Sequence, residues 1–298
     1  MNYYKKYIKY KNKYLMIKKN MKGGTYTGLR YIGEGAESIV YDMGDGKVLK
    51  IIKNQNMRIS DRERSVIEAV KDIPNFPKVY IYGLCKNNIK PDRETNVFCV
   101  DNGSEYQYII MDKIDGKDIL EIFYDKFKDY LNLDEIELRS KLEDETFVSK
   151  ITKFVHFYIN IIKKIVSSLK IANDAVRFRH NDFDFRNCLI SPTGEPTIID
   201  FGQSTIGNPS LECKDIFSYV NSFLGGSYCN RKDTIIKTYG DEHTIRFFDR
   251  CNKNCKTILA ILRDTPKITQ LQTLINECVP YWRRDISLDM LLNRISSL

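Results

Sequence analysis

One stretch, residues 180–202, constrains the fold of this 298-residue chain more than any other. It reads His-Asn-Asp-Phe-Asp-Phe-Arg-Asn-Cys-Leu-Ile-Ser-Pro-Thr-Gly-Glu-Pro-Thr-Ile-Ile-Asp-Phe-Gly. Short apolar runs at residues 188–191 and 196–199 flank a Pro-Thr-Gly turn, and this pattern predicts a β-hairpin. Because a hairpin folds its two ends together, we expect the residues just before and just after it to meet.

Three polar residues stand at the two ends of this predicted hairpin. Asp182 and Asn187 precede it, and Asp200 follows it. Two of these groups can bind a divalent cation while the third, a carboxylate, takes up a proton, and this combination suits phosphoryl transfer. The alternative is a pair of unrelated loops in which Asp and Asn serve only as turn residues.

The spacing of these residues resembles that of a known superfamily. His180-x-Asp182-x4-Asn187, followed by Asp200-Phe-Gly, is similar to the catalytic and metal-binding loops of protein-kinase-like enzymes. Each motif alone arises easily by chance, but the pair at this spacing, bridged by a hairpin, is a specific signal. The resemblance extends over about residues 26–223.

The resemblance implies a bilobal fold of the α+β class, with ATP between the lobes. Residues 25–115 would form the N-lobe, an antiparallel sheet with one helix, and residues 116–298 would form a mostly helical C-lobe. Apolar spacing in the second region also predicts helices. They are expected at residues 118–130, 133–142, 147–175, 213–224, 231–239, 241–262, 267–279 and 286–296.

The same resemblance implies a role for each polar residue of the stretch. Asp182 would orient an acceptor hydroxyl and accept its proton, while Asn187 and Asp200 would hold Mg²⁺ on the nucleotide phosphates. Arg186, four residues after Asp182, would neutralise the transferring phosphate. His180 is expected to be architectural.

A glycine-containing turn and a strand lysine make the predicted phosphate site. Gly33 and Gly35 allow backbone N–H groups to approach phosphate oxygens, because no side chain blocks them. The segment resembles the kinase glycine-rich loop. In a strand predicted after the next turn, Val48 and Lys50 share a face. Lys50 is the expected phosphate-binding cation, and the alternative is an exposed strand lysine.

A helix is predicted after this strand, with Ser60 as its N-cap and Ser60-x-x-Glu63 as a capping box. The kinase-like fold needs a glutamate on this helix to pair with Lys50. Glu63 lies in the middle of the apolar stripe of the helix, whereas Glu68 lies on the opposite face. We therefore expect Glu63 to be the partner, and the alternative is that Glu63 only caps the helix.

A strand predicted at residues 106–111 leads into a segment that resembles the hinge between kinase lobes. Met111 would stand at the back of the adenine pocket. Backbone groups of Asp112, Lys113 and Ile114 would form hydrogen bonds with adenine. The apolar walls of the pocket would be Val40, Val48 and Leu189.

Three features depart from ordinary protein kinases. Asn181 replaces the arginine that ties the catalytic loop to a phosphorylated segment, so control by such phosphorylation is not expected. Asp184 stands where protein Ser/Thr kinases carry a lysine, and it would repel phosphate, bind a cationic substrate or cap a turn. The stretch of residues 203–214, before a predicted helix with Asp215 at its start, is as short as in aminoglycoside and choline kinases and in atypical protein kinases.

The N-terminal segment has a composition of its own. Residues 1–22 carry eight lysines and no acidic residue, so they account for the net charge of +8. Apolar and tyrosine side chains recur there with 4-3-4-3-4 spacing, which predicts an amphipathic helix within residues 1–24. The segment is similar to Tyr/Lys-rich N-terminal helices of proteins from giant DNA viruses of the mimivirus group. It would bind an anionic partner or a partner helix, or form a solvated extension.

Composition also limits the location of the chain. No run of 18 apolar residues is present, and charges and tyrosines interrupt any apolar signal region, so we expect neither a membrane span nor secretion. Eight cysteines without a CxxC pair favour reduced thiols in the cytoplasm, which would be the host cytoplasm for a viral protein.

These observations together predict an enzyme that moves the γ-phosphate of ATP, bound with Mg²⁺, to a hydroxyl group. The acceptor would be a protein, as for an atypical Ser/Thr protein kinase. One alternative is a small-molecule kinase of the aminoglycoside or choline type. Another is a non-catalytic pseudokinase scaffold, against which stands the presence of Lys50, Asp182, Asn187 and Asp200 together.

Overall fold

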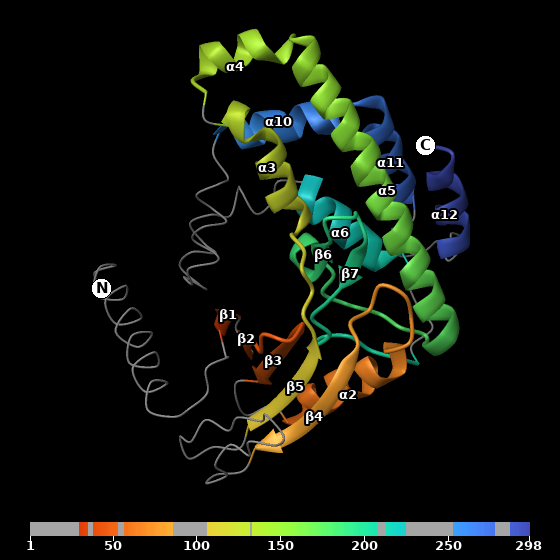
Figure 1. The fold of residues 1–298 in the computed structure, drawn as a ribbon. Coiled ribbons are helices and arrows are strands. Elements are labelled where there is room, and N and C mark those ends of the chain that lie inside the picture. Colours follow the sequence, from red (N-terminus) through yellow and green to blue (C-terminus); the bar gives the residue numbers. More distant parts are fainter. Residues whose placement is uncertain are drawn as a thin grey trace, which may run out of the picture.

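A computed structural model of the chain describes residues 30–34, 38–52, 57–85, 106–131, 133–207, 213–224, 253–277 and 287–298. Over these residues the chain is a mixed α+β protein, with strands in its first part and helices in its second (Figure 1). The expected α+β class is confirmed at this level. The predicted helices at residues 1–22 and 231–239, and Gly35, lie outside the described residues.

Five antiparallel strands form one sheet in the order β1-β2-β3-β5-β4. They are β1 (Arg30–Glu34), β2 (Ser38–Asp42), β3 (Lys47–Ile52), β4 (Val79–Cys85) and β5 (Tyr106–Asp112). Leu49 of β3 and Ile110 of β5 pair across these two neighbouring inner strands, and both are buried. The β2–β3 turn contains Gly44 and Gly46, at φ of +83° and +77°, where a residue with a side chain would be strained.

The helix α2 (Met57–Val70) packs against β4 and the long helix of the second part. Val66, Ile67 and Val70 form its buried face, and Glu63 is buried with them. The predicted N-cap is wrong, because the helix starts at Met57 and therefore includes Ser60. A capping box would need the Glu63 carboxylate to reach back along the helix, but that carboxylate faces the sheet.

Seven α-helices are described in the second part of the chain. They are α3 (Ile119–Leu131), α4 (Glu135–Leu142), α5 (Glu145–Val176), α6 (Lys214–Leu224), α10 (Lys253–Arg263), α11 (Pro266–Glu277) and α12 (Leu288–Ser296). Six of the predicted helices are confirmed to within a few residues, and α10 covers the end of the one predicted at residues 241–262. In the described part of the chain, no helix has the length and apolar composition that crossing a bilayer requires.

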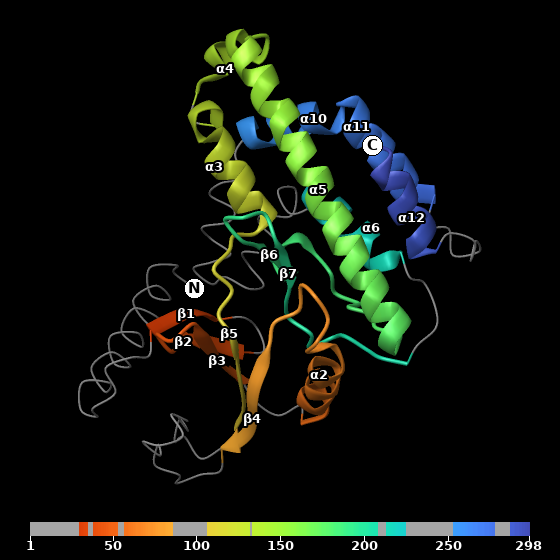
Figure 2. The ribbon, with the colours of Figure 1, turned by 45° about the vertical axis from the view of Figure 1, so that its right-hand side comes forward.

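The helix α5 forms the centre of this helical part and runs along its whole length (Figure 2). Its apolar stripe recurs every three or four residues, so one face is buried against α3 and α6. Phe154 packs edge-on against Phe123, with ring centroids 5.6 Å apart, and Tyr158 lies 5.2 Å from Phe223. These rings bury the largest apolar areas available to single residues, and they fix α3, α5 and α6 relative to one another.

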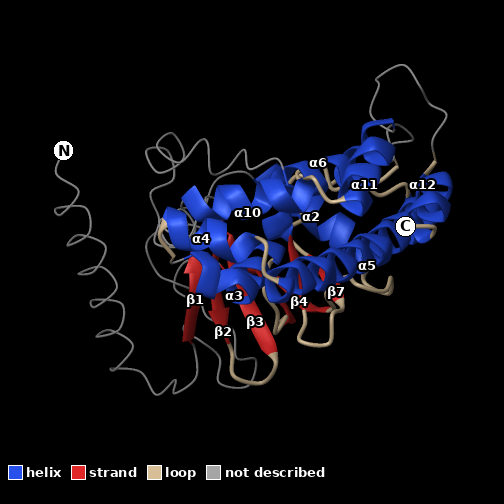
Figure 3. Cartoon of the chain, turned by 90° about the horizontal axis from the view of Figure 1, so that it is seen from above, coloured by secondary structure: helices blue, strands red, loops and turns tan. Residues whose placement is uncertain are grey.

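A β-hairpin lies between the sheet and the helices, as the sequence predicts. It consists of β6 (Cys188–Ile190) and β7 (Pro196–Ile198), and a 3-10 turn, η2 (Phe185–Asn187), precedes it. The connection from β5 to α3 contacts β6 through reciprocal backbone hydrogen bonds between Lys117 and Ile190, of 3.0 and 2.8 Å. Seen from above, the sheet lies on one side of the molecule and most helices on the other (Figure 3).

Candidate active site

Lys50 lies in the inner strand β3 and points its ammonium group toward the hairpin. Its Nζ is 2.6 Å from Glu63 Oε1 and 3.2 Å from Asp200 Oδ1. Burial disfavours the charge, but the two carboxylates outweigh it and raise the pKa of Lys50 above its ordinary value. The strand, the helix α2 and the hairpin are therefore joined by one cation.

Glu63, and not Glu68, faces this lysine. The Glu63 side chain is 4 % exposed, whereas that of Glu68 is 69 % exposed and pairs with Lys71 on the helix surface. The helical spacing explains the difference, because the two glutamates point in nearly opposite directions. The structure thus brings together Lys50 and the glutamate expected from the sequence.

Asp200 follows β7 directly and has a φ of +65°. Few residues other than glycine adopt this left-handed conformation, and aspartate and asparagine do so more readily than most. The Lys50 ammonium group lowers the pKa of Asp200 against the opposing effect of burial, so the carboxylate is ionised at neutral pH. The Ile199 N–H donates to Asn187 O at 3.0 Å, which closes the mouth of the hairpin as predicted.

Asp182 and Asn187 lie on the other side of this mouth. Asn187 Nδ2 donates to the backbone carbonyl of Asp182 at 2.6 Å. This bond orients the side-chain amide, so that the Asn187 carbonyl oxygen points away from the Asp182 carbonyl. Partial burial raises the pKa of Asp182, and the nearby carboxylates of Asp184 and Asp200 raise it further. A raised pKa makes this carboxylate a better proton acceptor than an ordinary aspartate.

Arg186 has a partner that the sequence did not predict. Its guanidinium forms a bidentate ion pair with Asp184, through Nε at 3.1 Å and Nη2 at 2.5 Å from Oδ2. Asp184 is buried and also accepts the Arg186 backbone N–H at 2.8 Å, so it caps the turn η2. Of the three roles considered for Asp184, the structure gives it the capping role, together with the arginine as a fixed cation.

Asp215, the buried second residue of α6, fixes the backbone that precedes Asp182 through two hydrogen bonds. Asp215 Oδ2 accepts the His180 N–H at 2.8 Å, and Oδ1 accepts the Asn181 N–H at 2.9 Å. The His180 ring is fully buried, and its Nε2 lies 2.8 Å from Ile199 O. His180 therefore has an architectural position, as expected.

Three of the residues predicted to contact the nucleotide lie on β2, β3 and β5, the strands that carry and flank Lys50. Val40 pairs with Lys50 across β2 and β3, and Val48 pairs with Met111 across β3 and β5. Leu189 lies in the middle of β6 and is partly exposed. Gly33 is not in the predicted turn, since it belongs to β1 and pairs with Val40. The strand continues to Glu34, and the residues between it and β2 lie outside the described part of the chain.

Two backbone N–H groups of the predicted hinge form hydrogen bonds within the protein. Asp112 is the last residue of β5, and its N–H donates to Lys78 O at 2.9 Å. The Lys113 N–H donates to Gly46 O at 2.8 Å. Neither N–H is available to adenine, which corrects part of the prediction for Asp112, Lys113 and Ile114. The carbonyl groups and the Ile114 N–H remain as the candidate contacts.

Sequence reasoning missed Asp42, a buried acid at the end of β2. Its carboxylate lies 2.9 Å from Lys113 Nζ and 3.1 Å from Arg30 Nη2, and it accepts the Gly44 N–H. These bonds lower the pKa of Asp42, with the Gly44 N–H as the largest cause. The only signal in the sequence is an acid in a strand that is otherwise mainly apolar, and this does not reveal its partners. Asp42 ties the hinge to β2.

The site as a whole fits a divalent cation. Two cations, Lys50 and Arg186, face four carboxylates, from Glu63, Asp182, Asp184 and Asp200, so the formal net charge is −2. Among the described residues, no three His, Cys, Asp or Glu side chains form a complete metal cluster. Mg²⁺ usually takes only one or two protein oxygens together with substrate phosphates, and Asn187 and Asp200 supply oxygens of that kind.

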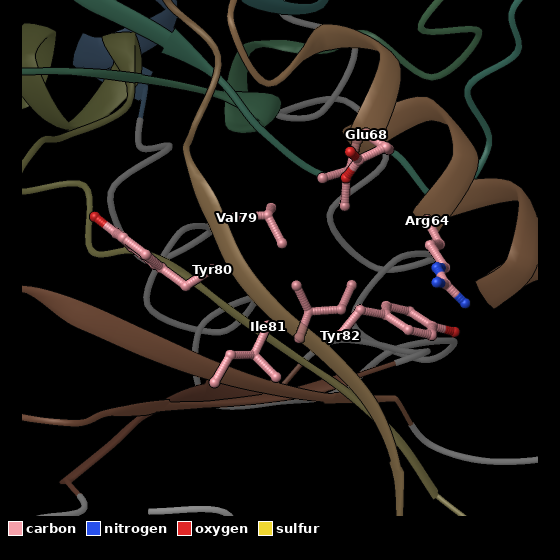
Figure 4. Close-up of a pocket in the computed structure, with 8 residues that line it drawn as sticks. Arg64, Glu68, Val79, Tyr80, Ile81 and Tyr82 are labelled. Carbon is pink, nitrogen blue, oxygen red and sulfur yellow. The ribbon is translucent and has the colours of Figure 1, made fainter. Parts of the chain in front are cut away.

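A separate cavity of about 190 Å³ lies between α2 and β4. Figure 4 shows Arg64 and Glu68 of the helix facing the strand residues Val79 and Tyr82. The Arg64 guanidinium lies over the Tyr82 ring, 4.9 Å from its centroid. Because Glu63 turns the other way, this cavity does not belong to the site around Lys50.

Comparisons with known proteins assign no family to the chain. No model of a known protein family matches it, and no curated protein of similar sequence is found. The geometry of the site therefore has to carry the functional argument.

Proposed function

We propose that the protein is an ATP-dependent phosphotransferase with the bilobal, protein-kinase-like fold, which transfers the γ-phosphate to a hydroxyl group. Lys50, fixed by Glu63, binds nucleotide phosphates. Asp182 orients the acceptor hydroxyl and accepts its proton. An atypical Ser/Thr protein kinase is the primary assignment. Among the described residues, the buried cysteines Cys188, Cys213 and Cys255 are not joined in disulfides, in keeping with a reducing compartment such as the cytoplasm.

One observation carries the proposal: Lys50 Nζ lies within hydrogen-bonding distance of both Glu63 and Asp200, although Lys50 and Asp200 are 150 residues apart in sequence. A structural ion pair would need only one carboxylate. The second carboxylate is 55 % exposed and stands beside Asp182 and Asn187. Phosphoryl transfer depends on fixed charges around a bound nucleotide, and this arrangement provides them.

Asn187 and Asp200 would hold Mg²⁺, which neutralises charge on the phosphates when it is bound. The protein contributes the rest. Lys50 and Arg186 place positive charge near the transferring group, and the raised pKa of Asp182 favours its uptake of the hydroxyl proton. Catalysis then comes mainly from positioning and from electrostatic stabilisation.

A specific observation favours a small-molecule acceptor as the second candidate. Residues 203–207 are hydrogen-bonded to residues 176–181, and α6 starts at Lys214. Little chain is left there for a platform on which a peptide substrate would dock. Identifying the phosphate acceptor therefore distinguishes an atypical protein kinase from a kinase of the aminoglycoside or choline type.

The test is transfer of labelled phosphate from ATP to a panel of proteins and small alcohols. We expect transfer by the natural chain and none by Asp200→Ala. The matched control is Asp45→Asn, which removes an exposed carboxylate in the β2–β3 turn. Nucleotide binding without any transfer would overturn the proposal in favour of a non-catalytic scaffold.

A further inference from the structure

The catalytic loop is attached to the segment that follows Asp200 through the side chain of Asn181. Asn181 Nδ2 lies 3.0 Å from the backbone carbonyl of Gln203 and 3.1 Å from Thr205 Oγ1. One amide group thus donates to two acceptors on the same short segment. An amide nitrogen has two protons, so both bonds can form together.

Backbone hydrogen bonds extend this attachment on both sides. Arg179 and Thr205 form an isolated antiparallel bridge, with N–H to carbonyl distances of 2.8 Å in each direction. Ser204 is fully buried, and its hydroxyl donates to His180 O at 3.2 Å. Residues 203–207 therefore lie against residues 176–181 as a short two-stranded structure.

Asn181 is itself held from the opposite direction. Its backbone N–H donates to Asp215 in α6, and its φ is +64°. Asparagine adopts this left-handed conformation more readily than most residues with a side chain. The residue therefore connects α6 on one side with Gln203 and Thr205 on the other, and Asp182 is its immediate neighbour.

We propose that Asn181 is a positioning residue that holds residues 203–207 against the catalytic loop without any covalent modification of either segment. This attachment fixes the backbone that carries Asp182. The effect of this attachment on turnover rests on the proposed phosphotransferase function, whereas the attachment itself does not depend on that function.

The chain offers a variant that removes only the side-chain bonds. Asn181→Gly keeps the left-handed backbone without strain and loses both amide hydrogen bonds. Thr205→Val removes one acceptor from the other end. The control is Thr193→Val in the β6–β7 turn, where the hydroxyl bonds only locally to Ser191.

Amide hydrogen exchange of the full chain measures the structural part. We expect the backbone N–H of residue 205, bonded to Arg179 O, to exchange about tenfold faster in Asn181→Gly and Thr205→Val than in the natural chain. Thr193→Val should leave this rate unchanged. An unchanged rate in Asn181→Gly would overturn the proposal, whatever the activity of the protein.

Turnover of labelled ATP measures the positioning part. We expect Asn181→Gly to lower kcat about tenfold or more and to leave the nucleotide KM unchanged, because the lost bonds orient Asp182 rather than bind the nucleotide. Treating the natural chain with a broad-specificity protein phosphatase should not change kcat. A full kcat in Asn181→Gly, or a loss of kcat after the phosphatase, would overturn the positioning role. Absence of turnover in the natural chain would contradict the proposed function and leave the exchange result to decide the attachment.

Discussion

The ammonium nitrogen of Lys50 lies 2.6 Å from Glu63 Oε1, where the lysine side chain is only 12 % exposed and the glutamate 4 %. Neither charge is stable alone in such a place, because an unpaired buried charge costs about 3–5 kcal/mol. The pair therefore fixes α2 against β3. It also holds the lysine where the Asp200 carboxylate can reach it.

Glu63→Gln should lower the free energy of unfolding by about 2 kcal/mol, less than the cost of a fully unpaired charge, because Asp200 still pairs with Lys50 and the size of the side chain is kept. Urea denaturation measures this change. The matched control is Glu68→Gln on the same helix, whose exposed pair with Lys71 is worth less than about 0.5 kcal/mol. Equal losses in the two variants would show that the buried Lys50–Glu63 pair contributes no more to the free energy of unfolding than an exposed pair does.

The pH dependence of activity should report the environment of Asp182. This carboxylate must be ionised to accept a proton, so kcat/KM falls as the pH drops through its pKa. Burial and two carboxylates raise that pKa, which places the acidic limb above the ordinary aspartate value of about 3.9. Asp184→Asn removes a negative neighbour and should move the limb to lower pH.

Arg186→Gln should shift the same limb in the opposite direction. The arginine lowers the pKa of Asp182, so its loss raises that pKa and moves the acidic limb to higher pH. Profiles of kcat/KM against pH measure both shifts. Glu195→Gln, an exposed change in the hairpin turn, is the control and should shift nothing. A shift of both variants in one direction would contradict this account of the site.

Local patterns in the sequence predicted the parts of the site that depend on regular geometry. The hairpin brought Asp200 to Asn187 because its two strands are short and its turn is tight. Helical spacing distinguished Glu63 from Glu68, because a helix of known period can bury only one of them. Strand alternation likewise put Val48 and Lys50 on one face.

Tertiary contacts decided the parts that the sequence did not predict. Ser60-x-x-Glu63 has the pattern of a capping box, but the ion pair with Lys50 takes the glutamate away from the backbone. The sequence predicted a phosphate as the partner of Arg186 but not the pair that the turn η2 makes with Asp184, two residues earlier. Such pairings depend on where the chain turns, and spacing alone does not contain that information.

The Mg²⁺ dependence of nucleotide binding should change when Asp200 is replaced. Asp200→Asn removes the charge of one proposed ligand, and changes even to residues around metal ligands cost about 10–100-fold in affinity. We expect the Mg²⁺ concentration for half-maximal nucleotide binding, measured by calorimetric titration, to rise at least about tenfold. Asp45→Asn should leave it unchanged. An unchanged Mg²⁺ requirement in Asp200→Asn would remove Asp200 from the metal site.

Gly116→Ala should loosen the connection between the sheet and the helices. A Cβ atom at this position would lie 2.8 Å from the carbonyl oxygen of Ile190, so the backbone bonds between Lys117 and Ile190 would have to shift. We expect a loss of about 1–3 kcal/mol in the free energy of unfolding, typical of overpacking. Asp115→Ala, an exposed neighbour, should cost less than about 0.5 kcal/mol. Equal costs would mean that the connection yields easily, and that contact with β6 does not fix the position of the sheet relative to the hairpin.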